Sequence, residues 1–202
     1  MGIFAAIVLA ATVDRIAAIV DRQVFAVSEI TQMAEIRFFP RTTAWSEDEY
    51  RKNILDALIA QALRFRDVER FGAEDVSKDA IEARLLQIQQ RFASPAEFAA
   101  AVQRAELTMD EVRALIKRQL QVETYIQDRF ATMIFVTPEE IEAYYRGTWS
   151  QQRKARGLPI PPLSDVQEEI RTLLKAQRLD QEVARWTAQL RARANVDIYT
   201  WR

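Results

Sequence analysis

The chain has 202 residues, with 28 basic and 29 acidic side chains and a formal net charge of −1. This balance provides no large positive field for binding a nucleic acid or an anionic membrane. The chain has neither cysteine nor histidine, which excludes thiolate metal sites, thiol nucleophiles and Ser-His-Asp catalysis.

The first segment, residues 1–13, is almost wholly apolar but too short to cross a bilayer, which needs about 20 residues. Its length fits the core of a signal peptide, and the small residues Ala10 and Ala11 could precede a cleavage site. The basic residues that begin a signal peptide are missing. We therefore interpret residues 1–12 either as a signal segment with a truncated start or as an apolar N-terminal segment.

Two short strands are predicted next, over 16–20 and 24–27, because apolar runs there flank the polar residues 21–23. A three-residue connection suits a β-hairpin, although it contains neither Gly nor Asn for a turn position with positive φ. After the hairpin, Ser28 is expected to cap a helix. Glu29 would lie in the first turn of that helix, where a carboxylate favours the helix dipole.

Five capping boxes of the form S/T-x-x-E/Q indicate where later helices begin. In such a box the hydroxyl accepts from the N3 amide, and the N3 side chain accepts from the cap amide. The pairs are Ser46/Glu49, Ser94/Glu97, Thr108/Glu111, Thr137/Glu140 and Ser164/Gln167. Apolar residues three and four apart follow them and predict a helix ending near Gly72, another over about 109–130 and a C-terminal one of about 28 residues.

Residues 147–163 have the composition of a linker, with two glycines and three prolines. Within this segment Arg153, Lys154 and Arg156 have no acidic neighbour. The basic residues form either a solvated linker or a docking patch.

The residues that follow the last helix, 195–199, alternate polar with apolar side chains and predict a third strand. A lone hairpin is marginally stable in water and needs a third strand or a covering helix. We therefore predict that the two ends of the chain pair in one sheet. The expected fold is mainly α, a multi-helix domain with a small antiparallel sheet formed by the N-terminal hairpin and the C-terminal strand.

A cluster of large apolar residues in a segment with little periodicity is the candidate for peptide binding. It consists of Met33, Phe38, Phe39 and Trp45, around a proline, and Trp149 beside the linker is added to it. Aromatic and Met side chains suit an adaptable binding surface, because they supply area and can repack. The alternative is that they cover the core beneath a long loop.

The order and spacing of these segments resemble the core module of SurA-type periplasmic chaperones and related parvulin foldases. The similar blocks are residues 13–21, 27–30, 55–63, 107–113, 136–141 with Tyr144 and Tyr145, 162–166, 186–194 and 196–198. The resemblance covers nearly all of residues 13–198 and implies a single chaperone core domain over 13–202.

The resemblance implies a holding chaperone that binds unfolded exported or outer-membrane polypeptides in the periplasm. In this family, parvulin prolyl isomerase domains usually lie between the Tyr-Tyr helix and the C-terminal helix. Here only residues 146–163 occupy that place, too few to bury a core. Parvulin sites also usually use histidines, which this chain lacks. We therefore expect no isomerase activity and no other enzymatic activity.

The expected binding is independent of ATP, because four glycines provide no Gly-rich loop for a phosphate. No cofactor, metal ion, nucleic acid or membrane span is expected either. The alternative function is a non-catalytic interaction module, in which a dedicated partner or a second copy of the chain, as a homodimer, fills the groove.

Overall fold

The computed structural model describes residues 14–72 and 74–199, and most of them are helical, which confirms the predicted fold class. The expected signal or apolar segment over 1–12 lies outside the described residues. The elements are β1 (Ile16–Val20), β2 (Gln23–Ala26), α1 (Val27–Glu35), α2 (Glu47–Phe71), α3 (Lys78–Gln89), α4 (Pro95–Arg104), α5 (Met109–Arg129), η1 (Ala131–Met133), α6 (Pro138–Tyr144), η2 (Tyr145–Trp149), α7 (Ser150–Ala155), α8 (Leu163–Arg193) and β3 (Val196–Ile198).

The described residues form two compact units. Unit 1 takes its residues from 1–59, 82–114 and 194–202, and unit 2 from 60–81 and 115–193. Because one domain can contain two compact units, the single domain expected over 13–202 remains a prediction. Within the described ranges no helix is long and apolar enough to cross a membrane.

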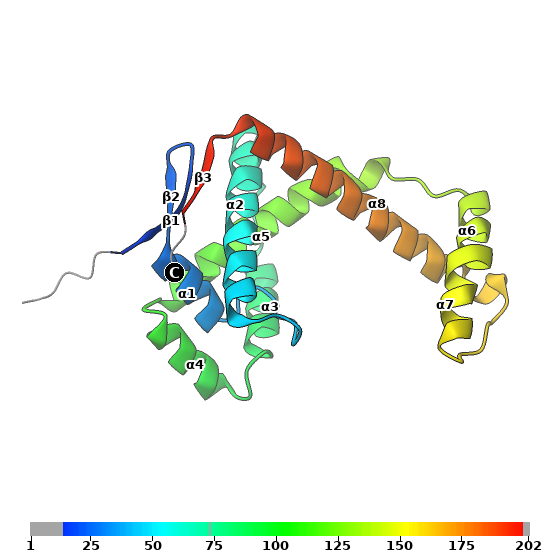
Figure 1. Ribbon diagram of the computed structural model, residues 1–202, viewed down its shortest axis with the longest axis horizontal. Coiled ribbons are helices and arrows are strands. Elements are labelled where there is room, and N and C mark those ends of the chain that lie inside the picture. The colour runs from blue at the N-terminus through cyan, green and yellow to red at the C-terminus, as the bar shows by residue number, and fades with distance from the viewer. Residues whose placement is uncertain (1–13, 73, 200–202) are drawn as a thin grey trace, which may run out of the picture. The chain divides into compact units, whose positions relative to one another are not determined.

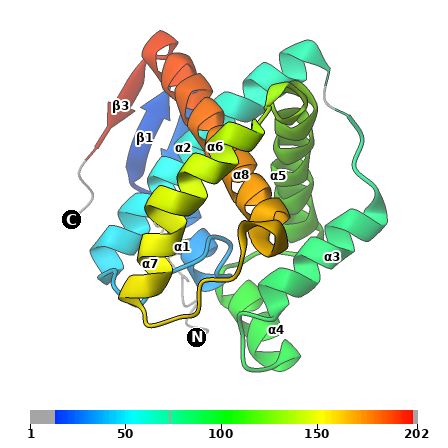
Figure 2. The same ribbon diagram turned by 90° about the vertical axis from the view of Figure 1, so that its right-hand side faces the viewer.

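The sheet of unit 1 has the strand order β2-β1-β3, with both pairs antiparallel. The prediction that the two ends of the chain pair is thus confirmed, and Figure 1 and Figure 2 show β3 beside the hairpin. The predicted three-residue connection is wrong, because Gln23 already pairs with Val20. Asp21 supplies the positive φ of the two-residue turn, at 54°, which Asp tolerates better than most residues.

Helix α1 begins differently from the prediction. Its N-cap is Ala26, whose backbone N–H donates to Glu29 Oε1 at 3.0 Å. Glu29 is therefore in the first turn, as predicted. Ser28 is not the cap, because its hydroxyl donates to the carboxylate of Asp14 instead.

Most of the predicted helix starts are confirmed. The reciprocal hydrogen bonds of a capping box join Ser46 to Glu49, Thr108 to Glu111 and Thr137 to Glu140. Ser94 accepts from the Glu97 amide, but the Glu97 carboxylate accepts from the amide of Ala93 rather than that of Ser94. The start predicted from Ser164 is wrong: α8 begins at Leu163 and runs for 31 residues, and the Ser164 hydroxyl donates to Asp165.

The segment 147–163 is helical over its first half, so its interpretation as a linker is wrong there. The π-helix η2 and helix α7 extend α6 to Ala155, and only the residues between α7 and α8 are non-helical. The three prolines all lie in this second half, so none of them interrupts the helix before it. Side-chain hydrogen bonds help to hold the non-helical part: Tyr145 Oη donates to Pro161 O at 2.7 Å, and Arg153 Nε donates to Pro159 O at 2.8 Å.

Among the described residues of unit 2, two core clusters lie on α8. One cluster surrounds Trp186 with Val68, Val122 and Ile126, and Trp186 Nε1 donates to Asp67 Oδ2 at 3.1 Å. The other cluster joins the first half of α8 to α6 and η2, and Figure 1 and Figure 2 show α6 beside this part of α8. Its buried members are Ile141, Trp149, Val166 and Ile170.

Candidate functional site

The site is built on the loop that joins α1 to α2 in unit 1. The loop begins with a Schellman motif, in which Phe38 N donates to Met33 O at 2.9 Å and Arg37 N to Ala34 O at 3.0 Å. Arg37 takes the left-handed conformation, with φ 48°. This motif turns the chain away from the axis of α1 and carries the loop over the end of α3.

Three of the five residues predicted to bind peptide present no free surface. Met33 and Phe38 are each 3% exposed, because they are the apolar pair that accompanies a Schellman motif. Trp149 is 6% exposed and belongs to the core of unit 2, where it stacks on Tyr145 with ring centroids 5.5 Å apart. In the structure these three side chains are buried with the core.

The other two predicted residues, Phe39 and Trp45, are half-buried and line one cavity of about 640 Å³. This volume lies within the range of small-molecule and side-chain pockets, roughly 300–1,000 Å³. We call it the aromatic–arginine cavity after the side chains that line it. These are Arg37, Phe39, Arg41, Trp45, Tyr50 and Arg91, with Ala34, Pro40, Thr42 and Thr43 between them.

Arg91, which follows α3, fixes the loop to the rest of unit 1. Its Nη1 donates to Phe38 O at 2.8 Å and also to Arg37 O, while Arg37 Nη1 donates to Arg91 O. The Arg37 guanidinium also lies over the ring of Phe92, 4.3 Å from its centroid. Burial lowers the pKa of Arg91, because part of its guanidinium is removed from water.

Tyr50 and Arg41 form another wall of the cavity. Tyr50 Oη donates to Phe39 O at 2.9 Å, which fixes the backbone at Phe39. The Arg41 guanidinium lies 5.0 Å from the centroid of the Tyr50 ring, and Arg41 Nη1 pairs with Glu47 at 2.8 Å. Burial raises the pKa of Tyr50, so its hydroxyl stays protonated and remains a donor at neutral pH.

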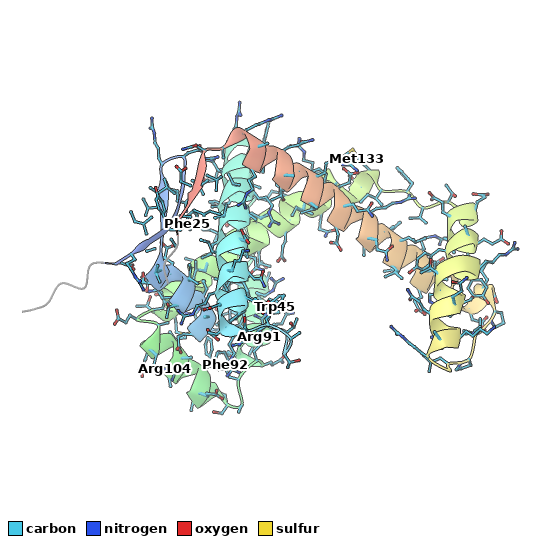
Figure 3. The ribbon with its side chains drawn as sticks, viewed as in Figure 1. Phe25, Trp45, Arg91, Phe92, Arg104 and Met133 are labelled. Carbon is cyan, nitrogen blue, oxygen red and sulfur yellow. The ribbon has the colours of Figure 1, made fainter. Side chains whose placement is uncertain are left out.

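The cavity has a cationic and aromatic character. Among the described residues that line it are three arginines and no carboxylate. Figure 3 labels Trp45 and Arg91, which approach it from the loop before α2 and from the end of α3. The arrangement offers flat aromatic surface and hydrogen-bond donors, which suits binding rather than proton transfer.

Sequence reasoning missed the polar part of this site. Arg37 and Arg41 lie among the residues of the predicted cluster, so their proximity to its aromatic side chains was a usable signal. Tyr50 lies eleven residues after Phe39, in a regularly spaced apolar position of α2, and so carries no signal of its own for a site. Arg91 gave no signal, because it lies 54 residues after Arg37 and reaches the site only through the fold.

The comparisons with known proteins give one weak match among curated sequences. No family model matches the chain. The chain is similar to Chaperone SurA of Alkalilimnicola ehrlichii, with 28% identity over 139 residues. The alignment covers 66% of this chain and 32% of that protein, so the chain spans about a third of the length of the relative that it matches.

Proposed function

We propose that this protein is an ATP-independent, chaperone-like protein that binds unfolded polypeptide in the aromatic–arginine cavity. The observation that carries the proposal is that Phe39 and Trp45 remain half-buried on the wall of an open cavity instead of closing over the core. The similarity to Chaperone SurA supports a chaperone-like role in general. By the same similarity, we propose the periplasm as its compartment and unfolded outer-membrane proteins as its clients.

The chemistry of the cavity suits reversible binding of an extended segment. Flat aromatic surfaces bury apolar client side chains without requiring one fixed sequence. The fixed loop lowers the ordering cost of binding, because Arg91 and Tyr50 already hold its backbone. This role requires neither a cofactor nor catalysis, and we propose that the protein has no prolyl isomerase activity.

Light scattering tests the proposal. A urea-denatured outer-membrane β-barrel protein is diluted into buffer with and without the full chain, and its aggregation is followed. We expect suppression near an equimolar ratio. The variant Phe39→Ser/Trp45→Ser should need about tenfold more protein, because loss of buried aromatic anchors typically costs more than 1.4 kcal/mol of binding free energy.

The matched control is Phe135→Ser, which removes an aromatic side chain that is 76% exposed in unit 2. It should suppress aggregation as well as the wild type does. Far-UV circular dichroism checks that all variants are folded. If the wild type fails to suppress aggregation at several-fold excess, or if all variants suppress it equally, the cavity is not a client-binding site.

One observation favours the alternative, a non-catalytic interaction module. Met133 and Phe135 are neighbours between α5 and α6, and they are 65% and 76% exposed. Large exposed apolar residues close together are typical of interaction surfaces. Sedimentation velocity distinguishes the two functions: under the alternative, a stable homodimer forms and Met133→Ser/Phe135→Ser dissociates it.

A further inference from the structure

We infer that the aromatic–arginine cavity selects client segments in which a carboxylate lies two residues from an aromatic side chain. This inference rests on the proposed function, because it specifies which segments the same cavity prefers. Three arginines line the cavity and, among the described residues that line it, there is no acid. A client carboxylate would supply an acceptor for these guanidinium groups that the lining itself does not provide.

Arg91 has the strongest reason to accept an anion. Within the described ranges, its side chain donates to backbone carbonyls, not to carboxylates. Burial opposes its charged form and lowers the pKa of Arg91. The charge of Arg84 acts in the same direction and Tyr50 in the opposite one. A carboxylate that approaches Arg91 would offset the effects of burial and of Arg84 in a setting partly screened from water.

Arg37 and Arg41 have acidic partners that a client can replace. Arg41 pairs with Glu47 at 2.8 Å and Arg37 with Glu97 at 3.3 Å, and the side chains of both pairs are substantially exposed. Exposed ion pairs contribute roughly 0–1 kcal/mol, so exchanging one carboxylate for another costs little. Guanidinium groups can also hold a carboxylate through two parallel hydrogen bonds.

The aromatic wall sets the spacing in the client. In an extended peptide, residues i and i+2 point to the same face and lie roughly 7 Å apart. A carboxylate at one of these positions and an aromatic ring at the other can therefore enter the same cavity. The ring would pack against Trp45 and Phe39 while the carboxylate faces the arginines.

Isothermal titration calorimetry with the full chain tests this selectivity. The probes are three peptides with blocked ends that differ at one position: Gly-Ser-Phe-Ser-Asp-Ser-Gly, and the same peptide with Asn or Lys in place of Asp. Asn has the shape of Asp without its charge. We expect the Asp peptide to bind about tenfold more tightly than the Asn peptide at low salt, and the Lys peptide to bind most weakly. Raising the salt should reduce the Asp preference.

Two variants locate the selectivity. Arg41→Gln removes a guanidinium of the wall, and Arg51→Gln is its matched control, because Arg51 also pairs with Glu47, at 3.3 Å, but does not line the cavity. Neither variant touches the hydrogen bonds of Arg91, so both should fold, as circular dichroism can verify. Arg41→Gln should lower the ratio of Asp to Asn affinity at least threefold, whereas Arg51→Gln should preserve it.

The outcomes separate the inference from the proposed function. If wild-type protein binds the Asp and Asn peptides equally, the inference is overturned and peptide binding stands. If Arg51→Gln lowers the ratio as much as Arg41→Gln, the preference comes from the general field of the protein, and the site is wrong. If none of the three peptides binds and the protein also does not suppress aggregation in the scattering assay, both the proposed function and the inference are overturned.

Discussion

At the scale of single residues, two carboxylates near helix starts have pKa values that are shifted in opposite directions. Glu111 accepts from Thr108 N at 2.7 Å and from Thr108 Oγ1 at 2.8 Å, and these bonds lower its pKa. Glu29 accepts one bond, from Ala26 N, but burial dominates and raises its pKa. The capping chemistry is similar, so the difference lies in how much water reaches each carboxylate.

The first prediction concerns Glu111→Gln. The pKa of Glu111 is lower in the folded than in the unfolded state, where it is about 4.3 for Glu. The charged carboxylate therefore stabilises the fold at pH values above the unfolded pKa. This stabilisation is lost as the pH falls through the folded pKa. The variant should therefore be less stable than wild type at pH 7, by a margin that narrows as the pH falls below 4. Urea unfolding at pH 3, 5 and 7 measures this margin.

Urea unfolding of Glu29→Gln at the same pH values should show the opposite pH dependence of stability relative to wild type. Its raised pKa means that the stabilising contribution of the protonated form is present below the unfolded pKa and is lost as pH rises through the folded pKa. Gln keeps an acceptor for the Ala26 amide but carries no charge. The stability of the variant relative to wild type should therefore increase between pH 3 and pH 7. This account is contradicted if the stability relative to wild type changes with pH in the same direction for both variants.

At the scale of elements, helix starts depend on which hydroxyl the chain places at the cap. Ser94 has the extended backbone of an N-cap, and its Oγ accepts from Glu97 N at 3.1 Å. Ser164 carries the same sequence signature but lies inside α8. That helix starts after Pro162, whose carbonyl accepts from Asp165 N at 3.1 Å.

The two serines therefore make a matched pair. Ser94→Ala should lower the free energy of unfolding by about 1 kcal/mol, because one amide at the start of α4 loses its acceptor. Ser164→Ala should change it by less than about 0.5 kcal/mol, as an ordinary surface substitution does. Chemical denaturation with urea measures both. A larger loss at Ser164 would show that this hydroxyl does cap α8.

Local signals account for the part of the fold that the sequence predicts correctly. Capping boxes, apolar spacing and the glycine at the end of α2, which has φ 95°, act within a few residues. The errors arise where a competing local group takes over, as Asp14 does at Ser28. The site was only half predictable, because its aromatic residues are near each other in sequence whereas Arg91 joins them through tertiary hydrogen bonds.

At the scale of the whole molecule, β3 completes the sheet of unit 1. Tyr199 N donates to Ala17 O at 2.9 Å, and Ala17 is fully buried. The side chain of Tyr199 itself is 45% exposed, so the backbone bond is its main contribution.

Replacing Tyr199 tests how much its backbone hydrogen bond to Ala17 contributes to the free energy of unfolding. Tyr199→Pro removes the N–H and leaves the buried Ala17 carbonyl unpaired, which should cost about 1–3 kcal/mol of the free energy of unfolding. Tyr199→Val keeps the N–H and suits a strand, so it should cost less than 1 kcal/mol. Thermal unfolding of both variants makes the comparison. Equal losses would mean that the side chain, not the bond, matters.

The pairing of β1 with β3 also sets the order in which the protein can be completed during its synthesis. Val20 pairs with Val196, so the partner of β1 is translated well over a hundred residues after it. At ribosomal rates of about 5–20 residues per second, β1 waits roughly 10–35 s for that partner. Unit 2, whose residues end at Arg193, is fully translated before unit 1. During this interval one edge of β1 has no partner strand, and such an edge can pair with another chain.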